Sequence, residues 1–308
     1  MILISEDVWG APFEQLSKRR AVHQDPELWN DAAKLKAEVA NAEVLVVRNR
    51  TQVTAEVIAA APKLKVIARA GVGLDNIDIK AADQAGVVVV AGLGANAVSV
   101  AELTLGLALT LRRQIALQDR QTKSGKWLRT PGNEVSGSTW GLLGCGATGR
   151  ATAKLLSGFG CKILGYDPFF KGNSEIQMVE WDQLISQSDV ISVHMPATSE
   201  TIGSINKSVF AAMKGSAILV NVGRGELINE NDLIKALKDS QIAGAALDVR
   251  TSEPPTTGEL ESLDNVILTP HVAGITKESQ AAINQILVDN IDLVLDGKTA
   301  THAVGANK

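Results

Sequence analysis

The chain has 308 residues, of which 45% are hydrophobic and 21% are charged, and its formal net charge is −4. This length predicts two domains of ordinary size, each with its own hydrophobic core. Aromatic residues make up only 4% and no run of Lys or Arg occurs, which argues against nucleic acid as the main ligand, because a phosphate-binding surface needs clustered basic residues.

The N-terminus and the two cysteines favour a protein of a reducing compartment. MILISEDVWG has no basic residue before its apolar run and turns acidic at Glu6 and Asp7, so we expect no signal peptide. Cys145 and Cys161 are too few for a disulfide framework. No apolar run approaches the ~20 residues that span a bilayer. We therefore expect a cytoplasmic protein with no membrane segment.

Short apolar runs alternate with helical patterns along nearly the whole chain. Such runs, rich in Val, Ile and Leu and without polar alternation, are typical of parallel strands that are buried on both faces. The predicted strands are 1–5, 43–49, 64–70, 87–92, 139–144, 161–167, 189–195, 217–223, 243–249 and 265–270. Helical patterns between them include 54–61, 99–113, 146–158, 230–239 and 277–295. The alternation predicts an α/β fold of two doubly wound, Rossmann-like parallel sheets.

The helix predicted from Ser99 to Arg113 is apolar along its length, which favours burial between two copies of the chain. Ser99 is the predicted N-cap, and Glu102 would complete a capping box. A turn-rich stretch, 126–138, follows, so we place a domain border near residue 97. The last helix would return to the first domain and make it discontinuous. The predicted domains are 1–97 plus 277–308, and 98–276 inserted between them.

The motif Gly144-Cys-Gly-Ala-Thr-Gly149 follows a predicted strand and opens a predicted helix, the context in which Gly-x-Gly-x-x-Gly indicates dinucleotide binding. Its glycines allow a tight turn, close approach of a pyrophosphate, and packing of helix on strand. The helix N-terminus would face the phosphates. Asp167 ends the next strand, 18 residues after Gly149 (167 − 149), where an acid binds the ribose of NAD and repels the additional phosphate of NADP. The alternative is that Asp167 only begins a turn before Pro168.

Arg224, Glu253 and His271 each follow a predicted strand. Ligands of open α/β sheets bind outside the carboxyl ends of the strands, so these three residues are candidates for one site. Reduction of a 2-keto acid needs a cation that holds the carboxylate and polarises the carbonyl, as Arg does. A histidine can give the proton, and a carboxylate beside it would orient the ring and favour the imidazolium. Each residue singly could have an ordinary loop role; together they favour chemistry.

In their order along the chain, the motifs resemble those of the D-isomer-specific 2-hydroxyacid dehydrogenases, and among these the D-3-phosphoglycerate dehydrogenase branch. The resemblance covers most of the chain, at 46–54, 68–78, 96–103, 124–127, 141–149, 165–168, 193–196, 221–228, 244–249, 252–255 and 269–274. It implies an NAD-dependent dehydrogenase of a small D-2-hydroxy/2-keto acid. It also implies a catalytic domain made from both chain ends, an inserted NAD domain, and a homodimer that pairs through the NAD domains.

The resemblance implies roles for single residues, with no metal. The catalytic residues are Arg224, Glu253 and His271. The predicted cofactor-binding residues are Gly144, Gly146, Ala147, Thr148, Gly149, Asp167, Met195, Val222, Gly223, Arg224, Asp248, His271 and Gly274. In this set Asp248 contacts the nicotinamide amide and Met195 lines the cofactor pocket. The predicted substrate-binding residues are Arg48, Ala70, Gly71, Val72, Gly73, Asn96, Arg224 and His271.

The chain departs from the family pattern at three places. Ala147 and Thr148 stand where a basic residue and Ile are common, so one phosphate contact is expected to be lost. Arg250 replaces a usual aromatic residue near Glu253. The chain ends at Lys308, so we expect no C-terminal regulatory domain and no serine feedback through one.

The sequence leaves the substrate open. Arg48 and Arg69 end predicted strands, and with Arg50 and Arg129 they are candidates to contact a second anionic group; the alternative for each is ordinary surface charge. The substrate is then 3-phosphoglycerate or another doubly anionic acid, such as a sulfonate, or else glyoxylate or hydroxypyruvate. We expect Arg129 to reach the partner subunit's site when the substrate carries the second anion. A formate dehydrogenase is set aside because it has Gln in place of Glu253. The alternative from another class is a cofactor-sensing, corepressor-like interaction protein. Proteins of that branch also have the Arg, Glu and His of the trio, so these residues do not exclude it.

Overall fold

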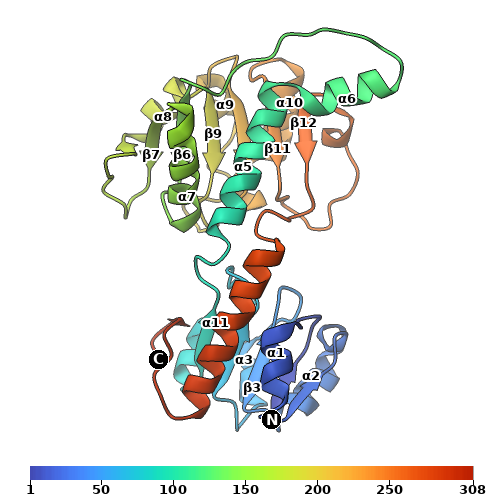
Figure 1. Ribbon diagram of the computed structural model, residues 1–308, viewed down its shortest axis with the longest axis vertical. Helices are drawn as coiled ribbons and strands as arrows, with labels where there is room; N and C mark the ends of the chain where they lie inside the picture. Colours follow the sequence, from blue (N-terminus) through green and yellow to red (C-terminus); the bar gives the residue numbers. More distant parts are fainter. Residues whose placement is uncertain (308) are drawn as a thin grey trace. The chain divides into compact units, whose positions relative to one another are not determined.

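The computed structural model describes residues 1–307, and the chain divides into two compact units. Unit 1 comprises Met1–Asn96 and Ile275–Lys308, and unit 2 comprises Ala97–Gly274. The first unit is therefore discontinuous in sequence. Each unit has a central sheet with helices on both faces (Figure 1). No helix of the described residues is both long and apolar enough to cross a membrane.

Unit 1, over its described residues, has a six-stranded sheet of order β13-β5-β4-β3-β1-β2. All neighbours in it are parallel except β13, which joins β5 antiparallel. The strands are β1 (Ile2–Ile4), β2 (Val22–Gln24), β3 (Val44–Val47), β4 (Val66–Arg69), β5 (Val88–Ala91) and β13 (Ala303–Val304). The helices are α1 (Ala11–Ser17), η1 (Leu28–Asn30), α2 (Ala32–Val39), α3 (Ala55–Ala59), α4 (Ile79–Gln84) and α11 (Lys277–Leu295).

Alternate residues of the unit 1 strands enter opposite cores, because successive side chains of a strand point to opposite faces. Val44 and Val46 of β3 pack in the core that α1 and α11 cover. Leu45 and Val47 of the same strand pack with side chains of α2 and α3 on the other face. A strand buried on both faces is apolar at every position, which explains the unbroken apolar runs in the sequence.

Unit 2 has a seven-stranded parallel sheet of order β12-β11-β10-β9-β6-β7-β8 across its residues, all of which are described. This is the strand order of a doubly wound nucleotide-binding sheet, and the order reverses between β6 and β9. The strands are β6 (Thr139–Leu143), β7 (Lys162–Tyr166), β8 (Gln177–Met178), β9 (Val190–Val193), β10 (Ile218–Asn221), β11 (Gly244–Leu247) and β12 (Val266–Leu268). The helices are α5 (Ala97–Arg112), α6 (Ile115–Lys123), α7 (Ala147–Leu156), η2 (Ser157–Phe159), α8 (Trp181–Gln187), α9 (Lys207–Ala212), η3 (Gly225–Leu227), α10 (Glu230–Lys238) and η4 (Leu260–Ser262).

The predicted α/β fold of two parallel sheets is confirmed. Every strand predicted from an apolar run is present, with ends that differ by at most two residues. The helices predicted at 54–61, 146–158, 230–239 and 277–295 are present as α3, α7, α10 and α11. The prediction missed the edge strands β2, β8 and β13, which are only two or three residues long and carry no apolar run of their own.

The prediction that Ser99 caps the long apolar helix is wrong. α5 begins at Ala97, so Ser99 lies in its first turn, where it is buried, and Glu102 lies beyond that turn. A capping box does occur at α11, where Thr276 and Ser279 exchange side-chain-to-backbone hydrogen bonds. The start of α5 depends on which residues the unit buries, and local capping rules do not contain that information.

Candidate functional site

The glycine motif forms the turn between β6 and α7. Gly144 has a φ of 96°, and a Cβ on it would lie 2.9 Å from the backbone of His194. A Cβ on Gly149 would lie 2.2 Å from the carbonyl oxygen of Gly144. Both positions therefore require glycine. β6 and β9, which end beside Gly144 and His194, are the strands between which the sheet order reverses, where doubly wound sheets bind their ligands.

The N-terminus of α7 is open enough to receive an anion. Gly146 is the N-cap residue and makes no side-chain cap, and nothing lies within 4 Å of a Cβ built on it. Gly146 and Ala147 are both exposed. The N–H groups of the first turn and the positive end of the helix dipole favour a phosphate there. The turn thus fits the pyrophosphate of a dinucleotide, although Ala147 and Thr148 bring no charge to it.

Asp167 follows β7, the strand next to β6, and is fixed beside the glycine turn. Its Oδ2 accepts the Cys145 N–H at 2.8 Å. Its Oδ1 accepts the N–H groups of Phe169 at 2.8 Å and Phe170 at 3.1 Å. The structure therefore brings together the glycine motif and the acid that the sequence spacing paired with it.

Burial, and secondarily the charge of Asp167, raises the pKa of the Cys145 thiol to about 12, so this cysteine is no nucleophile at neutral pH.

His194 also lies against the turn, and the sequence analysis did not single it out. Its Nε2 is 3.0 Å from Ser192 Oγ, which accepts a hydrogen bond from Trp140 Nε1 at 2.8 Å. Burial lowers the pKa of His194 to about 3, so the ring is neutral. Its Nδ1 is buried and has no hydrogen-bond partner among the described residues. A histidine directly after an apolar strand was the signal that could have identified it.

Arg224, Glu253 and His271 follow β10, β11 and β12, which are neighbours in the sheet. His271 Nδ1 lies 2.7 Å from Glu253 Oε2, a contact that becomes a charge-assisted hydrogen bond when the ring is protonated. The two side chains are 50% and 38% exposed, so a ligand can reach them. The structure thus brings the predicted acid–base pair into contact.

The loop that carries His271 is shaped by Asp248. The φ of His271 is 54°, in the left-handed region that few residues other than glycine adopt. The His271 N–H donates to the carbonyl of Asp248 at 2.8 Å and to that of Thr269 at 3.0 Å. The buried Asp248 carboxylate accepts hydrogen bonds from the Thr269 hydroxyl and from the N–H groups of Val272 and Ala273, at 2.6 to 2.9 Å. Asp248 therefore stabilises the loop that carries His271, and its contact to the cofactor stays a prediction.

The turn before Arg224 is held by Asn221, a buried polar residue that the sequence analysis missed. Asn221 Nδ2 donates to the Arg224 carbonyl at 2.9 Å, and Asn221 Oδ1 accepts the Gly223 N–H at 3.0 Å. A Cβ on Gly223 would lie 2.8 Å from the carbonyl oxygen of Met195. The backbone that carries Arg224 is therefore fixed by Asn221, and Arg224 Nη1 adds a hydrogen bond to the Gly223 carbonyl at 2.9 Å. An Asn that ends an otherwise apolar run was the available signal.

All residues predicted to bind the cofactor lie in unit 2. Met195 is buried in the hydrophobic core on the side of α8, α9 and α10. Val222 packs against the core on the opposite face of the sheet. Gly274 is the last residue of the unit. Their contacts to a cofactor stay predictions.

The predicted substrate residues of unit 1 follow two neighbouring strands. Arg48 follows β3, and Ala70–Gly73 follow β4. A Cβ on Gly71 would lie 1.3 Å from Arg69 Nη1, so the guanidinium lies over the backbone of this predicted cradle. Asn96 has a buried Oδ1 without a hydrogen-bond partner in residues 1–307. The substrate contacts of all these residues stay predictions.

A buried carboxylate that the sequence analysis did not identify holds the Arg48 loop. Glu6 accepts the four successive backbone N–H groups of residues 48–51, at 2.7 to 3.2 Å. The buried Asn76 amide donates to the carbonyls of Arg48 and Thr51 at 3.2 and 2.8 Å. Successive N–H groups of this kind form an anion-binding nest, and here the anion belongs to the chain itself. The backbone of Arg48 and Arg50 is thereby fixed.

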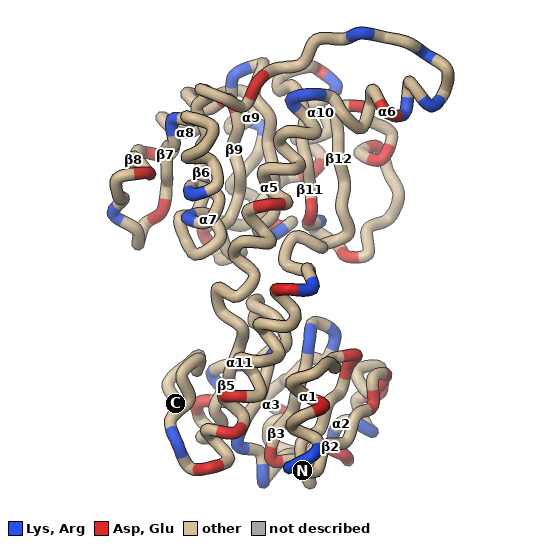
Figure 2. The backbone as a smooth tube through the Cα atoms, viewed as in Figure 1, with Lys and Arg blue, Asp and Glu red and all other residues tan. Residues whose placement is uncertain are grey.

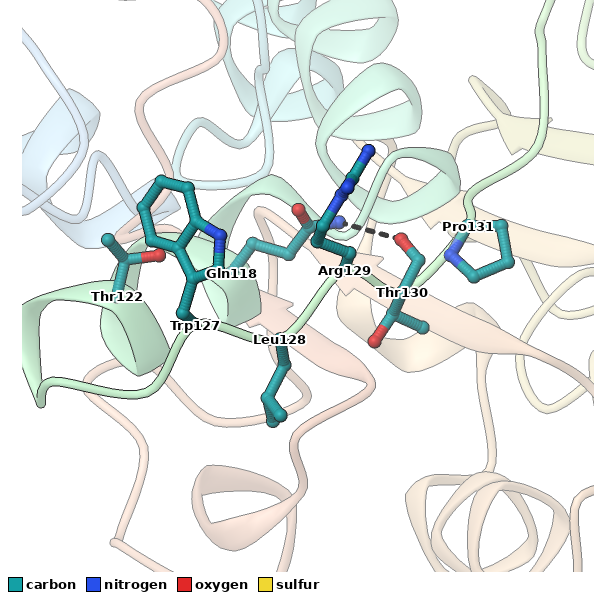
Figure 3. Close-up of a pocket in the computed structure, with 7 residues that line it drawn as sticks. All are labelled: Gln118, Thr122, Trp127, Leu128, Arg129, Thr130 and Pro131. Carbon is teal, nitrogen blue, oxygen red and sulfur yellow. Dashed lines mark hydrogen bonds between the residues drawn. The ribbon is translucent and has the colours of Figure 1, made fainter.

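Two hollows in unit 2 lie away from the trio and the glycine turn. Basic residues recur along α6 and the segment after it, at Arg120, Lys123, Lys126 and Arg129 (Figure 2). A hollow of about 350 Å³ opens there, lined by Gln118, Thr122, Trp127, Leu128, Arg129, Thr130 and Pro131 (Figure 3). A second, of about 190 Å³, lies near the end of α5. No cluster of metal-ligating side chains occurs in the described part of the chain.

The chain is similar to a known protein family and to named relatives. The family model described as "D-isomer specific 2-hydroxyacid dehydrogenase, NAD binding domain" matches residues 105–273. The chain is 44% identical over 274 residues to a D-3-phosphoglycerate dehydrogenase of Archaeoglobus fulgidus, a match that covers 87% of this chain and 52% of that protein. The chain spans about half the length of the curated relatives it matches.

Solved structures match nearly the whole chain. The TT0316 protein of Thermus thermophilus has a TM-score of 0.91 and 31% identity, over 98% of this chain and 99% of that one. The NADPH-dependent glyoxylate/hydroxypyruvate reductase of Sinorhizobium meliloti, in complex with NADP and malonate, has a TM-score of 0.88 and 28% identity, over 98% and 97%.

Proposed function

Because this chain belongs to the D-isomer specific 2-hydroxyacid dehydrogenase family, we propose that it is an NAD-dependent oxidoreductase that interconverts a small D-2-hydroxy acid and its 2-keto acid. The observation that carries the proposal is the 2.7 Å contact between His271 Nδ1 and Glu253 Oε2, in the unit that also holds the glycine turn. A histidine oriented by a carboxylate can pass one proton, which carbonyl reduction requires besides a hydride. We also propose a cytoplasmic location, in keeping with the free thiols Cys145 and Cys161.

Each member of the trio has a separate task in this reaction. The nicotinamide cofactor, when bound, supplies the hydride for C2 of the keto acid. Arg224 binds the substrate carboxylate and polarises the carbonyl. His271 gives its proton to the carbonyl oxygen during reduction and takes it back during oxidation. Glu253 orients the ring through its 2.7 Å contact with Nδ1.

For the substrate we propose a 2-keto acid with a second anionic group, such as the phosphorylated acid that corresponds to 3-phosphoglycerate. The relatives named D-3-phosphoglycerate dehydrogenase support this choice. Arg48, whose backbone Glu6 fixes, is the proposed contact to the second anionic group. The Arg50 guanidinium lies over the Trp29 ring, with 4.7 Å between Cζ and the ring centroid. Glyoxylate or hydroxypyruvate is the second candidate, favoured by the likeness to the Sinorhizobium meliloti reductase.

The experiment is steady-state NADH oxidation by the purified chain with a panel of 2-keto acids. The panel contains the phosphorylated keto acid, hydroxypyruvate, glyoxylate and pyruvate. The highest kcat/KM is expected for the phosphorylated acid, and a higher value for glyoxylate or hydroxypyruvate would favour the second candidate. If no member of the panel oxidises NADH, the enzyme proposal fails and a cofactor-sensing interaction protein becomes the better interpretation.

The position of Asp167 predicts that NADH is preferred over NADPH. Like charges near 4 Å apart at a protein surface repel by several kcal/mol, so kcat/KM with NADH should exceed that with NADPH by more than about tenfold. Asp167→Asn removes the charge and keeps one oxygen, for either the Cys145 N–H or those of Phe169 and Phe170, and it should reduce the ratio of kcat/KM with NADH to kcat/KM with NADPH. Equal efficiency of the parent chain with both cofactors would show that the role given to Asp167 is wrong.

We propose a homodimer, and the surface that would form it is α6 with the segment after it rather than α5. α5 packs on α7, β10 and β11 in its own unit, so much of the apolar surface of this helix is already covered. α6, by contrast, buries none of its residues, and it and the segment after it extend away from the sheet of unit 2 (Figure 1). Ile115, Trp127 and Leu128 are exposed there, Trp127 by 82%. Large exposed apolar side chains are typical of a surface that another chain covers.

Light scattering at micromolar concentration is therefore expected to give the mass of a dimer. Replacement of Trp127 and Leu128 by Ser should shift the mass toward the monomer, because both side chains would be buried in the pair. A monomeric parent chain would contradict the proposal. The prediction that Arg129 reaches the partner subunit's site rests on this dimer.

A further inference from the structure

The loop between β11 and η4 carries Glu253 and contains no helix or strand from Asp248 to Glu259, a segment described in full. Arg250 lies near the start of this loop, yet its side chain is only 10% exposed. Its Nε and Nη2 donate to the two oxygens of Glu230 at 3.0 Å each, and its Nη1 donates to Glu261 Oε1 at 2.7 Å. A bidentate pair of this kind is among the stronger and more directional contacts in proteins. Arg250 therefore has a fixed side chain in an irregular loop.

The two acids come from ordered elements on either side of the loop. Glu230 is the first residue of α10, and Glu261 lies in η4. The hydrogen bonds with Glu230 raise the pKa of Arg250, and the hydrogen bonds from Arg250 lower the pKa of both carboxyls. All three groups thus stay charged at any pH near neutrality. Glu230 Oε1 also accepts the Thr251 N–H at 3.2 Å, which extends the connection to the backbone.

The backbone of Arg250 leads directly to the acid–base pair. The Arg250 N–H donates to Glu253 Oε1 at 3.0 Å, while Oε2 of the same carboxylate meets His271 Nδ1 at 2.7 Å. A Cβ on Gly225 would lie 2.0 Å from the Arg250 carbonyl carbon, so this backbone also lies against the residue after Arg224. Arg250 is thus in contact with the loop of Glu253 and the loop of Arg224.

We propose that Arg250 is the positioning residue of the acid–base pair. The side chain, held between Glu230 and Glu261, fixes its own backbone, and the N–H of that backbone keeps Glu253 turned toward His271. This inference rests on the proposed function and deepens it. A partly exposed carboxylate on an irregular loop would otherwise populate several rotamers, and reacting groups must be held to within about 0.5 Å.

The first test is the kinetics of Arg250→Gln. A misplacement near 1 Å can cost on the order of 100-fold, so we expect kcat to fall by about 10- to 100-fold with the Kd for NADH unchanged. Glu230→Gln, which removes the charge of one partner, should give a smaller loss of kcat. Arg250→Lys keeps the charge but cannot donate to both oxygens of Glu230 at once, so its kcat should lie between those of Arg250→Gln and the parent chain.

The second test asks whether Arg250 acts through Glu253. In a double-mutant cycle, Arg250→Gln should cause no further loss of kcat once Glu253→Ala is present, because Glu253→Ala removes the carboxylate that the Arg250 N–H holds. Additive losses would overturn the proposal. Arg20→Gln is the matched control: Arg20 also bridges two carboxylates, Asp292 and Asp296, but in unit 1. Its replacement should leave kcat unchanged while lowering the melting temperature.

A third measurement does not depend on activity. Amide hydrogen exchange of the segment 249–262 should be faster in Arg250→Gln than in the parent chain and unaffected by Arg20→Gln. If the parent chain reduces no 2-keto acid, the proposed function fails, but the exchange measurement still tests whether Arg250 holds this loop in place. Unchanged exchange in Arg250→Gln would overturn that claim. If the parent is active and Arg250→Gln keeps the parent kcat, the positioning role is overturned and the proposed function stands.

Discussion

Replacement of His271 by alanine is expected to lower kcat for 2-keto acid reduction by ~10²–10⁴-fold, the range that a positioned general acid contributes. The physical reason is the orientation of the ring. Nδ1 is held by Glu253 at 2.7 Å, which leaves the other ring nitrogen, Nε2, to give the proton to the substrate. NADH should still bind, as fluorescence titration would measure, because the other predicted cofactor contacts, at the glycine turn and Asp167, are unchanged in this variant. A variant that keeps the parent kcat would remove His271 from the mechanism.

The matched variant for the same step is Glu253→Gln. It keeps the size of the side chain and an oxygen for the Arg250 N–H, but it removes the charge beside the ring. The contact between the carboxylate and the protonated ring is charge-assisted, and a neutral amide would hold the ring less firmly. Glu253→Gln should therefore lower kcat for keto acid reduction, by less than His271→Ala does. A kcat equal to that of the parent chain would show that the two residues are not coupled, and the role of Glu253 would be dropped.

Arg224→Ala is expected to lower kcat and raise KM for the keto acid together. Removal of a donor that stabilises developing charge on oxygen costs about 10²–10³-fold in kcat. The same side chain binds the ground-state carboxylate, so KM should rise as well. Arg224→Lys keeps the charge but lacks the bidentate fork, and it should recover part of the loss.

The structure offers a reason why Arg224→Ala should fold normally. Asn221 holds the carbonyl of Arg224 and the N–H of Gly223, and these two hydrogen bonds remain when the one from Arg224 Nη1 to the Gly223 carbonyl is lost. Thermal unfolding would verify this for each variant. If only KM changes while kcat is retained, Arg224 binds the substrate without polarising it, and the mechanism would need another group for that task.

Much of the architecture and the position of the trio follow from local sequence patterns. A strand that is buried on both faces must be apolar at every position, so the runs at 43–49 and 217–223 identified their strands without knowledge of their neighbours. The glycine motif is local as well, because strand, turn and helix are consecutive in the chain. Arg224, Glu253 and His271 follow strands that the sequence already identified, and parallel strands end at one edge of a sheet. The sequence alone therefore determined the fold class, the glycine turn and the edge at which the trio lies.

Only the tertiary structure decided which groups hold these residues in place. Glu6 meets the N–H groups of residues 48–51, more than forty positions away, and Arg250 meets Glu230, twenty positions away. Local rules could not assign these partners, because any acid of the chain could in principle pair with any unsatisfied donor. The same limit explains the error at Ser99, whose burial depends on what packs against α5. Long-range contacts depend on which atoms the folded chain brings within hydrogen-bond distance, and that is a property of the packed sheets and helices rather than of any segment.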